Sequence, residues 1–83
     1  MLNKKTLEAV AAEMDRKYRE ASEYEARAEI EANLGNPGRA RLAADCADHA
    51  YAYLEGIAWV LQAAGYDYDL HEETNSIKIF KEA

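Results

Sequence analysis

A four-residue motif, GNPG at residues 35–38, divides this 83-residue sequence into two long stretches of helix-forming residues. The stretch before it, residues 3–34, contains neither Gly nor Pro and is rich in Ala, Glu, Lys and Arg, which favour helix. Within the motif, the first glycine can adopt the left-handed conformation that ends a helix, the asparagine can cap the next helix, and the proline suits its first turn. We therefore predict a first helix over about residues 3–34 and a second over about residues 37–64.

Both predicted helices carry a seam of residues spaced alternately three and four positions apart. This heptad spacing turns one face of each helix toward a partner helix. The two seams are Leu7, Ala11, Met14, Tyr18, Ala21, Glu25, Ala28 and Ala32, and Ala40, Ala43, Ala47, Ala50, Leu54, Ile57, Leu61 and Ala64. Small residues lie near the turn and larger ones at the far end, so the sequence predicts a tapered, antiparallel αα-hairpin. Glu25 interrupts the apolar seam, and it is expected either to be shielded by a neighbour such as Arg27 or to face a partner.

After Gly65, apolar residues recur at every second position, which predicts strands. Tyrosine and leucine alternate with aspartate in residues 66–70, and residues 76–80, SIKIF, place two isoleucines on one face. We predict a short C-terminal β-hairpin with a polar loop between its strands. The fold class is mainly α, and residues 1–83 are expected to form a single domain.

Apolar side chains point in almost every direction from the last three turns of the second helix, so this helix needs cover on two sides. We expect the β-ribbon to fold back near Trp59 and complete one small core. A compatible alternative is that aromatic residues stay partly exposed for docking, because Trp and Tyr are enriched at binding hot spots. The candidate partner-binding residues are Tyr53, Gly56, Trp59, Val60, Tyr66 and Tyr68. Open strand edges and a short helical pair also predict a homodimer.

The charge balance, 10 Lys and Arg against 16 Asp and Glu, gives a net charge of −6. This balance argues against direct nucleic-acid binding and favours basic partners. The candidate acidic surface comprises Glu20, Glu25, Glu29, Glu31, Asp67 and Asp69. On a rigid hairpin it could mimic a phosphate backbone and block the basic groove of a nucleic-acid-binding enzyme, as small phage anti-defence proteins do; the alternative is an ordinary acidic surface. Glu13 with Lys17, and likewise Asp15 with Arg19, are expected to form ion pairs four residues apart.

One cluster of side chains has metal-ligand spacing, namely Asp45, Cys46 and His49 within the second helix. A metal would need a third and a fourth ligand, which only His71 or distant acidic residues could supply. As a catalytic pair, Cys46 and His49 lack an orienting third residue and oxyanion donors. We therefore expect no metal, no cofactor and no enzymatic activity.

A single cysteine suits a reducing compartment, and no stretch approaches the roughly 18–20 apolar residues of a membrane span. The N-terminal residues also lack the apolar run of a signal peptide, so a cytoplasmic location is expected. Together these features predict a non-enzymatic protein-interaction module that acts as an inhibitor, adaptor or regulator. The alternative is a structural homodimer or a small subunit of a larger assembly.

Overall fold

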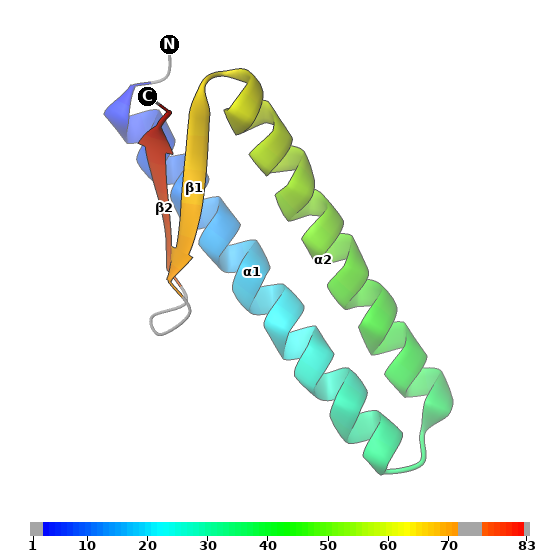
Figure 1. Cartoon of the computed structure of the whole chain (residues 1–83). Coiled ribbons are helices and arrows are strands. Elements are labelled where there is room, and N and C mark those ends of the chain that lie inside the picture. Colours follow the sequence, from blue (N-terminus) through cyan, green and yellow to red (C-terminus); the bar gives the residue numbers. More distant parts are fainter. Residues whose placement is uncertain (1–2, 72–75, 83) are drawn as a thin grey trace.

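A computed structural model describes residues 3–71 and 76–82 of the chain. The elements are, in order, α1 (Lys4–Asn33), α2 (Pro37–Ala63), β1 (Tyr66–His71) and β2 (Ser76–Lys81). The two helices form an antiparallel hairpin, and the strands form a two-stranded antiparallel ribbon beside its open end (Figure 1). The mainly α fold predicted from the sequence is confirmed; the predicted polar loop falls on residues 72–75, outside the described ranges.

The helix ends follow the local chemistry of the sequence. The Asn3 side chain caps α1 by accepting a hydrogen bond from the Thr6 backbone N–H over 2.8 Å. Gly35 adopts a φ of +78°, which reverses the chain, and proline opens α2. Asn36 occupies the N-cap position of α2, but its side chain donates to the Glu31 carboxylate over 2.9 Å instead of capping the helix. The motif therefore works as predicted except for the role of this one side chain.

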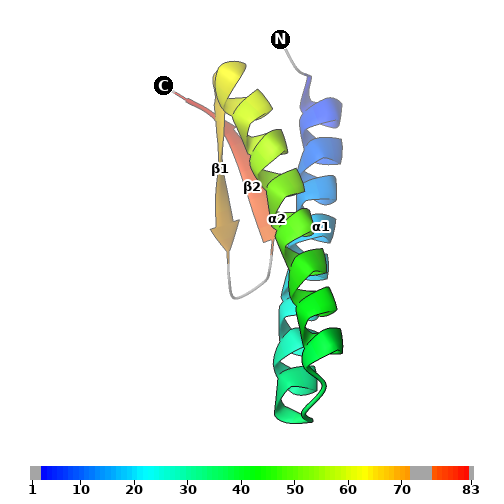
Figure 2. The same ribbon diagram turned by 90° about the vertical axis from the view of Figure 1, so that its right-hand side faces the viewer.

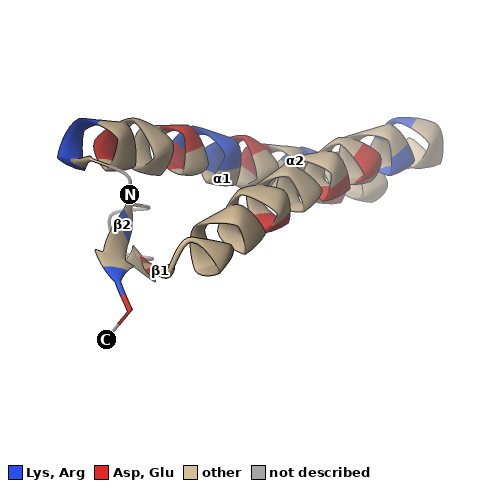
Figure 3. Cartoon of the chain, turned by 90° about the horizontal axis from the view of Figure 1, so that it is seen from above, with Lys and Arg blue, Asp and Glu red and all other residues tan. Residues whose placement is uncertain are grey.

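The helix pair is tapered, as the two seams predict. Near the turn, small residues such as Ala43, Ala47 and Ala50 are buried between the helices, which lets the backbones approach closely. Toward the other end the helices diverge, and the ribbon lies beside the opening (Figure 3). The centre of the core lies at this end, where both helices and both strands meet. Its buried members are Met14, Leu61, Tyr66 and Ile77.

The ribbon presents one apolar face to the helices. Tyr68 is paired with Ile79 and Leu70 with Ile77 in the antiparallel register, so that all four side chains pack into or against the core. The backbone N–H of Ile77 donates to the Asp15 carboxylate of α1, which ties β2 to that helix across 62 residues of sequence. Alternation in the strands thus produces the predicted half-buried ribbon.

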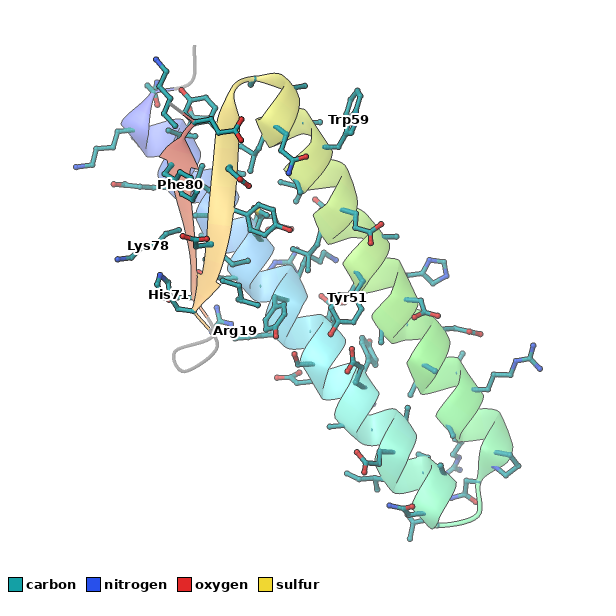
Figure 4. All side chains as sticks on the ribbon, viewed as in Figure 1. Arg19, Tyr51, Trp59, His71, Lys78 and Phe80 are labelled. Carbon is teal, nitrogen blue, oxygen red and sulfur yellow. The ribbon has the colours of Figure 1, made fainter. Side chains whose placement is uncertain are left out.

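The position of the ribbon corrects one expectation and confirms another. It folds back on its own chain and completes one core, as predicted. It does not cover the Trp59 side of α2, because that indole remains 71% exposed and points away from the ribbon (Figure 4). The reason is the taper: two diverging helices leave a wedge lined by Met14 and Leu61, and the apolar face of the ribbon fills it from one side. The opposite side of the helix pair is left bare (Figure 2).

Candidate protein-docking surface

The C-terminal half of α2 exposes an unusual amount of apolar surface. Tyr53, Trp59 and Val60 are 48%, 71% and 59% exposed. Glu55 is the one charged residue between positions 50 and 63, so this part of α2 is almost uniformly uncharged, whereas α1 alternates acidic and basic residues (Figure 3). Large exposed apolar patches on a small protein are typical of interaction sites.

An open, apolar groove of about 620 Å³ runs between α1 and α2 beside these residues. We call it the helix groove. Its lining comprises Val10, Glu13, Tyr53, Gly56, Ile57, Val60 and Leu61. The ribbon lies on one side of the helix pair (Figure 2). The residues of α2 that face it, such as Tyr51 and Leu54, line a different cleft, so the helix groove belongs to the side of the helix pair that the ribbon leaves bare. The ribbon fills the wedge between the two helices from one side, and the helix groove is the other side of that wedge, which stays unfilled.

A charged rim borders the helix groove on α1. Arg16 donates two hydrogen bonds to Glu13 and lies 3.8 Å from Glu20. The hydrogen bond from Arg16 lowers the pKa of the Glu13 carboxyl below its ordinary value. Lys17 lies 3.5 Å from Glu20 and also sits over the Tyr53 ring, 4.8 Å from its centroid. The expected pairing of Glu13 with Lys17 is therefore wrong, because the Arg16 guanidinium binds that carboxylate and the Lys17 ammonium is held by Glu20 and the aromatic ring.

The predicted partner-binding residues divide into two groups. Tyr53, Gly56 and Val60 line the helix groove, and Trp59 lies beside it on the outer edge of α2. Tyr66 is buried in the core, so its expected place on an exposed surface is wrong. The companion tyrosine, Tyr68, is half-buried and packs against the core. Both tyrosines point inward because they occupy alternate positions of β1, the same alternation that carries Leu70 into the core.

Val10 and Ile57 line the helix groove, although the sequence does not predict them as groove residues. Ile57 belongs to the seam of α2, yet it remains partly exposed at the groove because the helices diverge there. Val10 lies four residues before Met14 and occupies the edge of the same seam. The increase in side-chain size away from the turn is the sequence signal for these two residues. It indicates that the helices diverge, and diverging helices leave the residues beside the seam uncovered wherever no other element packs against them.

The candidate acidic residues of α1 are spread over two faces. Glu20 lies on the groove side, where it contacts Arg16 and Lys17. Glu25 accepts a hydrogen bond from the Tyr51 hydroxyl, which faces the ribbon side. Because Glu25 is exposed, its carboxylate can stay hydrated within the seam, and its partner comes from the facing helix and is not Arg27.

The remaining acidic candidates lie near the turn and on the ribbon. Glu31 accepts the hydrogen bond from Asn36 near the turn, and Glu29 is exposed one turn beyond Glu25 on the same face. On β1, Asp67 accepts a hydrogen bond from the backbone N–H that follows it, and Asp69 is exposed opposite Lys78 in the register. The six acids therefore do not gather into one patch.

A second cleft, of about 260 Å³, lies between the ribbon and α2. Tyr18 and Tyr51 meet in it edge to face, with ring centroids 6.5 Å apart and planes at 71°. Tyr51 points from α2 toward α1 (Figure 4). The hydrogen bond to Glu25, together with partial burial, raises the pKa of Tyr51 to about 12.

This raised pKa gives a prediction for Glu25→Gln. Removing the carboxylate is expected to return the pKa of Tyr51 from about 12 toward its ordinary value of 10. Because the folded state holds the proton more tightly, the contribution of Tyr51 to stability is intact below about pH 10 and is lost as the pH rises toward about 12. Carbon-13 NMR titration of the tyrosine rings measures this directly. Glu29→Gln, one turn away, is the control and should leave the Tyr51 titration unchanged.

The Cys46 and His49 side chains lie on the groove side of α2, where they line a shallow extension of the helix groove. Asp45 is exposed and does not line that extension, and His71 lies at the end of β1. Within residues 3–71 and 76–82, no three His, Cys, Asp or Glu side chains are grouped as a metal ion would require. Over the same residues, neither helix combines the length and apolarity needed to cross a bilayer.

Comparison with known proteins yielded no match to a protein-family model, a curated protein or a solved structure.

Proposed function

We propose that this chain is a non-enzymatic protein-interaction module, and that the helix groove binds an amphipathic helix of a partner protein. The observation that carries the proposal is the groove itself, a volume of about 620 Å³ between two rigid helices, with Tyr53 and Val60 exposed along its α2 edge. Grooves of this kind bind helices that insert apolar side chains three and four residues apart.

The composition of the groove supports a helical occupant. Gly56 leaves open space at its centre, since a Cβ placed there would meet no atom within 4 Å. A partner backbone could approach closely at that point while its side chains pack against Tyr53 and Val60. Trp59, on the adjoining edge, offers a further large contact of the type found at binding hot spots.

An acidic inhibitor of a basic nucleic-acid-binding enzyme is a narrower version of the same proposal. It would use the Glu side chains of α1 and would lose affinity steeply as salt is added. Because Glu20 and Glu25 lie on different faces and already have partners within the chain, the apolar groove supports binding more directly than the acidic residues do.

Val60→Lys tests the proposal. A charge at this exposed position leaves the core intact but places an ammonium where the partner helix must pack, so capture of a partner by the tagged chain should fall about tenfold or more. Capture is measured in parallel at low and high salt, and helix content by circular dichroism. Ala26→Lys adds the same charge at an exposed position of α1 and should capture as the unaltered chain does.

The outcomes separate the two versions. Capture that survives high salt and fails only with Val60→Lys supports docking in the helix groove. Capture that is lost at high salt and with Glu20→Gln, but is unchanged by Val60→Lys, supports binding through the acidic surface. Equal capture by all variants contradicts both.

A further inference from the structure

The chain exposes more surface than a monomeric globular protein of its size. Its accessible area is 6077 Å², roughly 1,100 Å² more than the about 5,000 Å² expected for a compact 9.3 kDa chain. The radius of gyration, 15.1 Å, likewise exceeds the about 12 Å expected for 83 residues. A stable interface of standard size covers about 800 Å² on each partner. The excess is therefore large enough to be one side of such an interface.

The bare face of α2 carries a second stripe of residues with heptad spacing. Its members are Leu42, Cys46, His49, Tyr53, Gly56 and Val60. Two of them, Cys46 and His49, line the extension of the helix groove, and Tyr53 joins that extension to the groove itself. Leu42 is 65% exposed and continues the stripe toward the turn. An exposed heptad stripe is the surface that another helix covers.

The order of residues in this stripe is self-complementary. A two-fold axis through the level of residue 51 would place Leu42 opposite Val60 of a second copy, two branched apolar side chains. The same axis pairs Cys46 with Gly56, both small, at the points of closest helix approach. At the centre it pairs His49 with Tyr53, two rings that can share a hydrogen bond. Interfaces between identical chains related by a two-fold axis require this kind of self-complementarity.

From these observations we infer that the occupant of the bare α2 face is a second copy of this chain, packed as an antiparallel α2–α2 pair in a four-helix dimer. The inference rests on the proposed function, because it names the partner of the same groove. In each copy the ribbon lies on one side of the helix pair (Figure 2), away from the bare face of α2. In the proposed dimer the two ribbons would therefore lie on its outer faces. The alternating acids and bases of the α1 rim border the interface and keep it near neutral.

The test uses Gly56→Cys together with the native Cys46. In the antiparallel pair these two positions face each other across the interface, so mild oxidation should join two chains through a pair of disulfides. Within one chain they are about 15 Å apart along the helix, beyond the about 7 Å limit for a disulfide. The substitution is sterically harmless, since no atom lies within 4 Å of the added Cβ.

Two matched controls isolate the geometry. In Cys46→Ala/Gly56→Cys the remaining thiols of the two copies are about 15 Å apart in the proposed dimer, so they should not bond. Ala52→Cys keeps Cys46 and adds an exposed thiol on the outer edge of α2. We expect about tenfold more covalent dimer from Gly56→Cys than from either control at equal concentration. Added salt should strengthen the association, because each copy carries a net charge of −6.

Crosslinking of Gly56→Cys at the level of the two controls would overturn the antiparallel dimer. If Val60→Lys nevertheless abolished capture of a different protein, the proposed docking function would stand while self-association failed. Efficient crosslinking of Cys46→Ala/Gly56→Cys would also contradict the inference, because it would require the two α2 helices to run parallel.

Discussion

Met14→Ala is expected to lower the free energy of unfolding by about 2–5 kcal/mol, the range for deleting a large side chain from a packed core. Met14 is fully buried at the point where both helices and both strands converge. A domain of this length has a total stability of only about 4–12 kcal/mol. The substitution therefore removes a large part of the stability, and urea denaturation at fixed protein concentration measures the loss.

Ile30→Ala is the control for this prediction. Ile30 is 57% exposed on α1 and lies outside both seams and the α2 stripe, so its truncation should change the free energy of unfolding by no more than about 0.5 kcal/mol. Equal effects of the two substitutions would mean that the core does not lie where the helices and the ribbon meet.

Asp15→Ala is expected to loosen the ribbon from α1. The Asp15 carboxylate accepts the hydrogen bond of the Ile77 backbone N–H, and removing it leaves that half-buried donor without this acceptor, at a cost of about 1–3 kcal/mol. Besides lowering the free energy of unfolding of the whole chain, the substitution should have a local effect. It should accelerate hydrogen exchange more at the Ile77 amide than at helical amides near the turn. Exchange measured residue by residue by NMR gives both results.

Asp15→Asn supplies the matched control for the ribbon contact. Its amide oxygen can still accept the hydrogen bond, so protection of the Ile77 amide should largely return. If Asp15→Ala left exchange at Ile77 unchanged, the contact would not be what holds the ribbon against α1.

The fold could be predicted from the sequence because its signals are local and agree with one another. The GNPG turn, the two seams and the alternating strands each depend on residues close in sequence, and their spacing determines which faces meet. The taper could also be predicted, since the large apolar residues of both seams all lie in the half away from the turn.

The side on which the ribbon packs could not be predicted in the same way. Its position depends on Asp15, which the sequence pairs equally well with Arg19 on the same helix. In the structure, Arg19 instead donates to the Asp15 backbone carbonyl, leaving the carboxylate for β2. A contact between residues 62 positions apart leaves no periodic trace in the sequence, and without it the ribbon and Trp59 were expected on the same side of α2.

The sequence predicts the part of the candidate site that α2 forms alone. It does not predict the part that depends on how α1 and α2 are placed relative to each other. Tyr53, Trp59 and Val60 can be identified from the sequence because α2 has apolar residues on every face. Such a helix exposes some of its apolar side chains wherever no other element covers it. The contribution of α1, through Val10 and the Lys17–Tyr53 contact, follows from the angle at which the helices diverge, which the sequence does not specify.

We propose that the bare face of α2 binds another helix, in the first instance that of a second copy. Sedimentation equilibrium of the unaltered chain over a wide concentration range tests it most directly, with Val60→Lys and Ala26→Lys measured alongside. We expect a mass approaching twice 9.3 kDa for the unaltered chain and Ala26→Lys, and 9.3 kDa for Val60→Lys. A mass of 9.3 kDa for all three chains at every concentration would contradict it.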